Sequence, residues 1–184
     1  MKIGLTFFIL FGWPLVGWSQ DLYLARRMAF SFFSEAPVED ISAKTDKGVS
    51  ALNVSSRAIY FKVPIRSFEF RKSLMKQHFN ENYLESEKYP VAEFRGNVLE
   101  NIDPKKDGTI PVTVQGKLNI HGVIKDYTVK GELQVSNGSI AANAKFPVKL
   151  EDHRIKIPSL VIRNIAEIVD VQVSAVYGPS AQTK

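Results

Sequence analysis

Three histidines, His78, His121 and His153, are the side chains best suited to hold a metal ion or to transfer protons. A zinc site needs ligands that converge in tetrahedral geometry, and histidine ligands on one element usually stand a few residues apart. These three lie far apart in the sequence, and Asp152 beside His153 forms no motif on its own. We therefore expect His78 to orient a helical loop and His121 to lie in a turn, with no metal site. Catalysis by His78 or His153 is the alternative.

Other patterns that carry chemistry are missing from the sequence. There is no cysteine for thiol catalysis, no Gly-x-Ser-x-Gly nucleophile motif and no glycine-rich phosphate-binding loop. Glu81, Glu85 and Glu87 beside Lys88 are better explained by a solvated helical face than by an acid-base pair. The sequence therefore predicts a protein that is not an enzyme and needs no cofactor.

Aromatic residues make up 11% of the chain and indicate binding of an apolar ligand rather than catalysis. A pocket for an apolar ligand needs apolar side chains at alternate strand positions, and small residues such as Gly116, Gly131, Ala142 and Ala144 leave room for the ligand. The alternative is a non-catalytic envelope interaction or stress-related protein, in which the same side chains fill a solid core and an apolar patch around Tyr83 and Tyr89 is exposed. The predicted apolar lining consists of Phe30, Phe32, Phe61, Phe68, Phe70, Phe79, Tyr83, Phe94, Val114, Leu118 and Phe146.

Basic residues near the same region are candidates for the rim of such a pocket. Arg71, Lys76 and His78 are the predicted rim residues, with Lys62 and Lys72 nearby, because an anionic head group needs several donors. Each of them is equally explained as an ordinary surface charge. As a set they predict where a polar head group binds.

The net charge of +5 and the pI near 9.3 come from basic residues that are scattered singly along the chain. Nucleic-acid binding usually requires a clustered basic stripe, so we expect no nucleic-acid partner. A diffuse positive charge is compatible with peripheral contact with an anionic membrane. The sequence does not define the oligomeric state, and a dimer is compatible with it.

The N-terminus has the pattern of a signal peptide. Met1-Lys2 is a short positive region, Ile3 to Val16 is apolar, and Gly17 and Ser19 place small residues before Gln20. The apolar run is shorter than the roughly 20 residues of a membrane-spanning helix. We expect cleavage after Ser19, leaving residues 20–184 as one domain in a periplasmic or secreted protein.

The rest of the chain is dominated by period-two alternation, which predicts half-buried strands. Asn137-Gly138 between two such runs predicts a hairpin. One segment, Arg71 to Leu84, has helical spacing instead, and we expect Asn80-Glu81-Asn82 to interrupt it. The predicted strands are 59–65, 112–120, 127–135, 140–148 and 169–177, with shorter ones at 29–33, 48–53 and 91–99.

About eight strands with one short helical insertion predict an all-β fold, since closing the sheet removes its exposed edges. The expected architecture is an antiparallel β-barrel. A barrel of this size has interior space for packed side chains or for one slender ligand.

Two blocks resemble the YceI-like family. His78 to Phe94 (HFNENYLESEKYPVAEF) is similar to the family's aromatic turn that leads through Lys-Tyr-Pro into a strand. Gly116 to Lys125 (GKLNIHGVIK) is similar to its strand-turn-strand block. The resemblance covers roughly Phe30 to Tyr177. It implies a lipocalin-like, usually periplasmic barrel that binds a polyisoprenoid-type lipid along its axis.

The chain departs from the family pattern at two places. Leu74 to Gln77 replaces an Arg-Asp pair that usually precedes the histidine of the first block, so the resemblance supports binding of a lipid tail better than of its head group. Asp21 to Arg27 matches the usual opening strand poorly. We expect a barrel that is shorter or more open at that edge.

Overall fold

The computed structural model describes residues 21–35, 40–156 and 167–180. Residues 1–19, the predicted signal peptide, lie outside the described residues. Among the described residues, none of the helices has the length and apolar character needed to cross a membrane. The strands are β1 (Leu22–Ser34), β2 (Ile41–Thr45), β3 (Val49–Asn53), β4 (Ala58–Pro64), β5 (Glu69–Phe70), β6 (Val91–Val98), β7 (Gly108–Ile120), β8 (Val123–Ser136), β9 (Ser139–Lys149) and β10 (Ile168–Pro179).

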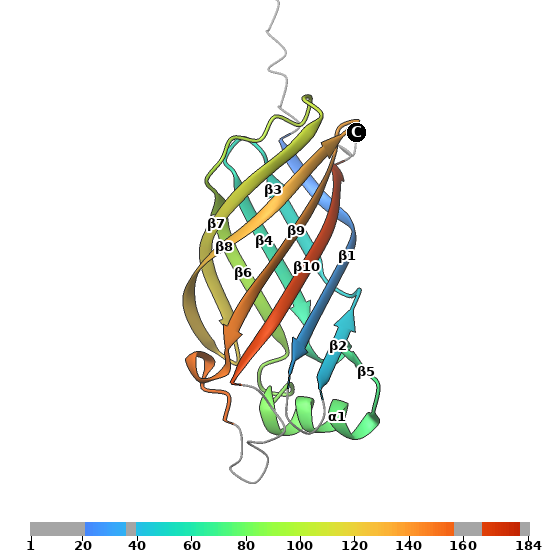
Figure 1. Ribbon diagram of the computed structural model, residues 1–184, viewed down its shortest axis with the longest axis vertical. Coiled ribbons are helices and arrows are strands. Elements are labelled where there is room, and N and C mark those ends of the chain that lie inside the picture. The colour runs from blue at the N-terminus through green and yellow to red at the C-terminus, as the bar shows by residue number, and fades with distance from the viewer. Residues whose placement is uncertain (1–20, 36–39, 157–166, 181–184) are drawn as a thin grey trace, which may run out of the picture.

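These strands form one antiparallel sheet that closes into a barrel (Figure 1). Around the barrel in the described chain, eight strands follow one another in the order β10-β9-β8-β7-β6-β4-β3-β1, and β1 pairs with β10. β2 and β5 extend the sheet from β1 outside this ring. The predicted all-β barrel of about eight strands is therefore confirmed. Closure leaves most strands of the ring without a free edge.

The first strand differs from the expectation of a short or open edge. β1 has 13 residues and pairs with β10 from Tyr23 to Phe33. The register shifts between Ala25 and Arg27, which is a β-bulge. Inward residues are Tyr23 and Ala25 before the bulge and Met28 after it, so no single alternation covers the strand. The bulge explains why Asp21 to Arg27 matches the usual opening strand poorly.

The long strands near the C-terminus are joined by tight turns. Asn137 and Gly138 both have positive φ, at 49° and 73°, in the predicted hairpin between β8 and β9. His121 and Gly122 have φ of 53° and 72° between β7 and β8. Such backbone angles fit the right-handed twist of paired strands. The predictions of the hairpin and of His121 in a turn are both confirmed.

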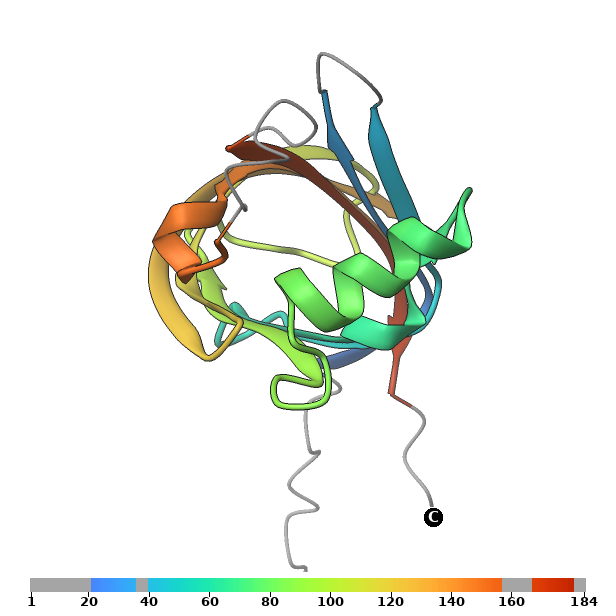
Figure 2. The same cartoon turned by 90° about the horizontal axis from the view of Figure 1, so that it is seen from below.

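The helical insertion consists of α1 (Ser73–His78) and the π-helical turn η2 (Phe79–Tyr83). The interruption expected near Asn80 is a change of helix type, because Leu84 donates its backbone N–H to the carbonyl of Phe79. The insertion lies across part of one end of the barrel, which we call the mouth (Figure 2). The short helical turn η3 (Leu150–His153) is at the same end.

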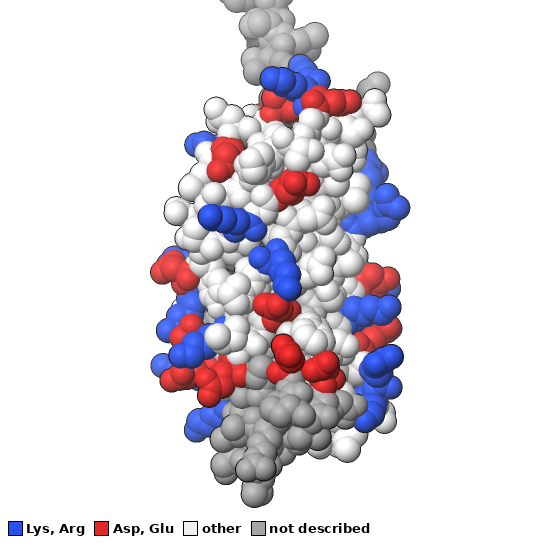
Figure 3. Space-filling view, in the orientation of Figure 1, with Lys and Arg blue, Asp and Glu red and all other residues white. Residues whose placement is uncertain are grey.

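The opposite end of the barrel is filled by side chains. Leu52, Ile140 and Tyr177 are fully buried there within one hydrophobic cluster. The hydroxyls of Ser50 and Tyr177 lie 2.6 Å apart, which satisfies both groups inside the core. On the outer surface seen in Figure 3, basic and acidic side chains are interspersed. The barrel is thus filled at one end, and its helical segments α1, η2 and η3 lie at the mouth.

Candidate ligand-binding cavity

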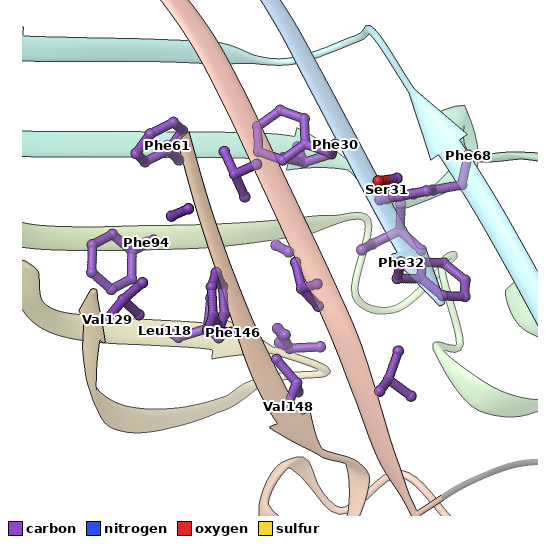
Figure 4. A pocket seen from close by; sticks show the side chains of 18 of the residues that line it. Phe30, Ser31, Phe32, Phe61, Phe68, Phe94, Leu118, Val129, Phe146 and Val148 are labelled. Carbon is purple, nitrogen blue, oxygen red and sulfur yellow. The ribbon is translucent and has the colours of Figure 1, made fainter. Parts of the chain in front are cut away.

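A cavity of about 460 Å³ occupies the barrel between its filled end and the mouth. Its walls come from the inward faces of the long strands, where every second side chain points into the barrel. Figure 4 shows Phe61 and Phe94 close together toward one end and Phe32 and Phe68 toward the other. The interior is therefore not solid, and the alternative of a completely filled core is wrong.

All eleven residues predicted as apolar lining line this cavity. Four of their rings, those of Phe30, Phe61, Phe94 and Phe146, line the cavity from four different strands, and Phe61 and Phe94 also pack against the cluster at the filled end. The rings of Phe30 and Phe61 meet edge to face with centroids 6.1 Å apart. That these side chains contact a ligand stays a prediction. The lining residues that the prediction did not include are mainly aliphatic, among them Val63, Ile65, Val129, Leu133, Val148, Val169, Val171 and Val173.

Small residues have two different roles in the barrel wall. Gly131, Ala142 and Ala144 line the cavity and leave it open, as their size predicted. Gly116 instead lies beneath the ring of Phe94, and a Cβ atom built on it would stand 2.7 Å from that ring. The glycine therefore positions an aromatic side chain that lines the cavity.

Four phenylalanines join the helical insertion to the barrel wall. Phe79 of η2 stacks on Phe32 of β1 with ring centroids 5.4 Å apart, and it also contacts Phe68 and Phe70. Phe32 meets both Phe68 and Phe70 as well. Because aromatic clusters bury large apolar area, this one fixes the insertion at the mouth.

The predicted rim residues are distributed unevenly. His78 is exposed at the end of α1 and lines the cavity. Arg71 and Lys76 are exposed and do not line it, and Arg71 borders a separate outer groove beside β1 and β10. Lys62 lies 3.6 Å from Glu93 in an ion pair on the outer face. Contact of Arg71, Lys76 and His78 with a head group stays a prediction.

Sequence reasoning missed a polar network at the mouth. His121 Nε2 lies 2.7 Å from a carboxylate oxygen of Glu85, and its Nδ1 lies 3.2 Å from the backbone carbonyl of His153. Each ring nitrogen of His121 therefore faces an oxygen atom that accepts hydrogen bonds. This network links the segment after η2 to the β7–β8 turn and to η3. No spacing in the sequence indicates it, because its members belong to three separate elements.

His153 is fully buried within this network. Its Nδ1 donates to the carbonyl of Val123, and Tyr127 donates its hydroxyl to Nε2 at 3.1 Å. Burial lowers the pKa of His153 and raises the pKa of Tyr127. His153 does not line the cavity. Its hydrogen bonds to Val123 and Tyr127 hold η3 against β8.

Tyr83 and Tyr89, where an interaction protein with a solid barrel would expose an apolar patch, are both partly buried. Tyr83 lines the cavity, where burial raises the pKa of its hydroxyl. Tyr89 packs on the His121 ring at 4.5 Å between centroids, and Lys88 lies over its ring. Both rings are therefore in contact with other parts of the barrel. In the described part of the chain, no three His, Asp or Glu side chains converge as a metal site would require.

A closed antiparallel barrel with an apolar cavity and a helical insertion over its mouth defines a class of barrel proteins suited to hold one small apolar molecule. Within that class the family is clear, since the sequence matches the family model for the YceI-like domain over residues 25–177. The chain belongs to the YceI-like family. Among curated protein sequences, none matches the chain significantly.

Solved structures share the fold. A polyisoprenoid binding domain from Saccharophagus degradans, implicated in plant cell wall breakdown, is 15% identical with a TM-score of 0.73, covering 87% of this chain and 99% of that one. BcnA from Burkholderia cenocepacia is 15% identical with a TM-score of 0.68, covering 81% and 95%. A Campylobacter jejuni YCEI protein is 16% identical with a TM-score of 0.55, covering 74% and 81%.

Proposed function

We propose that this protein is an exported binding or carrier protein that holds an isoprenoid or a similar long apolar lipid in its barrel. The observation that carries the proposal is the apolar cavity of about 460 Å³, lined by aromatic and aliphatic side chains. Such a volume and lining are typical of sites that bury most of a small apolar ligand. The structural relative described as a polyisoprenoid binding domain supports the same class of ligand.

A binding assay with matched variants tests the proposal. Val171 lines the cavity, whereas its neighbour Gln172 is exposed on the other face of β10. An amide facing an apolar chain loses its hydrogen bonds, at a cost of about 1–3 kcal/mol. Val171→Asn should therefore weaken displacement of a fluorescent fatty acid probe by farnesol about tenfold or more, and Gln172→Asn should bind as the original protein does. Equal binding by both variants, or no binding by the original protein, would contradict the proposal.

Export is the second part of the proposal, and the N-terminal sequence pattern supports it. The chain expressed with its own N-terminus in a Gram-negative host should appear in the periplasmic or secreted fraction. Intact-mass spectrometry should show a mature protein that begins at Gln20. An uncut chain in the cytoplasmic fraction would overturn this part while leaving lipid binding untouched.

Peripheral contact with a membrane is the third part. Leu74 of α1 is 59% exposed, and Arg71 and Lys76 stand on the same short segment. Exposed apolar and basic side chains together favour a surface of anionic lipids. The protein should sediment with phosphatidylglycerol vesicles at low salt and not with phosphatidylcholine vesicles, and Lys76→Glu should reduce sedimentation. Equal sedimentation with both kinds of vesicle would contradict membrane contact through these basic residues.

A further inference from the structure

The short turn η3 carries part of the cavity wall at the mouth. Leu150, its first residue, and Ile155, two residues after its end, both line the cavity. Ile155 is buried and packs with Ile65 and Leu84, which line the cavity as well. The backbone N–H of Ile155 donates to the carbonyl of Leu150, which joins the two ends of the turn. The position of η3 therefore shapes this part of the cavity.

His153 joins η3 to β8 and to the β7–β8 turn. Its Nδ1 lies 3.1 Å from the carbonyl oxygen of Val123, and its Nε2 lies 3.1 Å from the hydroxyl of Tyr127. Its own carbonyl oxygen lies 3.2 Å from Nδ1 of His121. Arg154 follows with a φ of 56°, in the left-handed region that residues other than glycine seldom adopt. The contacts of His153 thus hold a turn whose backbone shape is unfavourable on its own.

Tyr127 connects the same histidine to the cavity lining by a second route. Its ring is stacked on the His153 ring with centroids 5.9 Å apart, and it meets Phe146 edge to face at 6.0 Å. Phe146 lines the cavity. His153 is therefore in contact with the cavity wall through η3 and through Tyr127, although it does not line the cavity itself.

The charged groups around His153 do not compensate for a proton on its ring. Asp152, the preceding residue, favours the charged ring, whereas Lys125 of β8 opposes it. Burial outweighs Asp152, so the pKa of His153 is lowered. The other charged or titratable side chains on the elements around it are Glu151 and Arg154 at η3, Lys149 of β9, which is paired with Glu151, Glu167 before β10, Tyr127 of β8, and His121 with its partner Glu85.

A proton on Nε2 changes what this ring can do. Nε2 then carries a hydrogen and no longer accepts the hydrogen bond from Tyr127. The ring also becomes a charge buried away from water, which is costly. A histidine in contact with water has a pKa of about 6.5. Below this pH, a state in which η3 leaves the wall and the ring meets water is therefore favoured over the closed state.

We propose that protonation of His153 releases η3 from the barrel wall and thereby lowers the affinity of the cavity for its apolar ligand. The inference rests on the proposed function, because it concerns regulation of the same cavity. A ligand that contacts the closed wall binds the form with a neutral ring. Its affinity should therefore fall as the pH drops below about 6.5, by at most about tenfold for each pH unit.

Equilibrium dialysis with tritium-labelled farnesol at pH 7.5 and pH 5.0 tests the inference. Farnesol has no group that titrates in this range, and ordinary carboxylates stay largely ionised at pH 5.0. The dissociation constant of the original protein should rise about tenfold at pH 5.0. Circular dichroism should show a folded barrel at both pH values, so that the loss of affinity has a local cause.

The chain has three histidines, so three variants locate the pH dependence. His153→Gln carries an amide whose oxygen can accept from Tyr127 without titrating, and its dissociation constants at the two pH values should differ by less than about twofold. His78→Gln and His121→Gln keep His153, and each should retain the rise of about tenfold whatever its affinity at pH 7.5. A purely structural role of His153 would instead weaken binding by His153→Gln at both pH values and leave the rise between them in place.

Hydrogen exchange of the original protein is a second measurement that needs no variant. The backbone amides of Arg154 and Ile155 donate to carbonyls of η3. After correction for the intrinsic effect of pH on exchange, both amides should lose protection at pH 5.0, whereas those of residues 175–177 at the filled end should keep theirs. Saturating farnesol should restore the protection of Arg154 and Ile155.

The possible failures are distinguishable. A dissociation constant that does not rise at pH 5.0, a rise that persists in His153→Gln, or unchanged protection of Arg154 and Ile155 would each overturn the inference and leave lipid binding intact. Unfolding of the whole barrel at pH 5.0 would also overturn it, because the loss of affinity would then need no release of η3. Absence of farnesol binding at pH 7.5 would overturn the proposed function itself, and the inference with it.

Discussion

At the scale of single residues, His153 connects the structure of the mouth to pH. Its ring is fully buried and neutral when it donates to Val123 and accepts from Tyr127. Burial is the largest cause of its lowered pKa, while Asp152 opposes the shift and Lys125 adds to it. A group whose pKa is lowered on folding contributes stability above its unfolded pKa, and this stability is lost as the pH falls through the folded value.

The free energy of unfolding should therefore fall as the pH drops below about 6.5, the usual pKa of histidine. The neutral variant His153→Gln isolates this effect, because every other titratable group stays in place. Urea unfolding at pH 7.5 should show the original protein to be the more stable of the two, and its advantage should shrink at pH 5. If the stability advantage of the original protein over the variant grows at pH 5, protonation of His153 does not destabilise the folded protein.

Gly116 provides a second test at the residue scale. A methyl group at this position would collide with the Phe94 ring and with the backbone of Arg95. Overpacking of this kind costs about 1–3 kcal/mol, so Gly116→Ala should lower the free energy of unfolding by that order. Gln115→Ala, at the exposed neighbouring position, is the control and should change it little. An unchanged midpoint for Gly116→Ala in urea unfolding would mean that the ring moves aside freely.

At the scale of secondary-structure elements, period-two alternation predicted most of the barrel and failed where the alternation changes phase. In the strands from β7 to β10, apolar and polar residues alternate without interruption. The predicted ranges for these four strands therefore lie within the observed strands. In β1 the bulge at Arg26 shifts the alternation by one residue, so the two halves of the strand appear unrelated in the sequence. A period-two pattern is informative only while the pairing register stays constant.

The candidate site was predictable to the same extent. All eleven predicted lining residues lie on the cavity. Alternation accounts for those on the strands, whereas Phe68, Phe79 and Tyr83 lie outside the strands. The network of Glu85, His121 and His153 could not be predicted, because it depends on how η3 and the segment after η2 meet the β7–β8 turn. Such contacts are set by closure of the barrel and leave no periodic signal in the sequence.

We expect contacts of the Phe79 ring, rather than the stability of α1 itself, to hold the helical insertion in place. α1 has only six residues, too few for a stable isolated helix. Phe79→Ala removes the ring that contacts Phe32, Phe68 and Phe70. Limited proteolysis should then cut within residues 71–84 much faster while the barrel strands remain resistant. Leu74→Ala, on the exposed side of α1, is the control, and equal cleavage of both variants would contradict the anchoring role of Phe79.

At the scale of the whole molecule, the barrel divides into a filled half and a hollow half. Side chains at the filled end pack against one another, whereas side chains around the cavity face open space inside the barrel. Local opening is easier where buried apolar contacts are few. Without ligand, backbone amides of residues 144–148 and 169–173 should therefore exchange hydrogen faster than those of residues 50–53 and 175–177, which do not line the cavity.

A ligand that fills the cavity supplies the missing contacts to the hollow half. At about one hundred times its dissociation constant it adds roughly 2.7 kcal/mol to the free energy of unfolding by mass action. For a chain of this size each 1 kcal/mol raises the melting temperature by about 2–4 °C, so the expected rise is about 5–10 °C. Added protection in hydrogen exchange should be concentrated in residues 144–148 and 169–173. A rise in melting temperature without added protection in these residues would mean that the ligand binds outside the barrel. Because Val171 lines the cavity, Val171→Asn should reduce both the rise in melting temperature and the added protection.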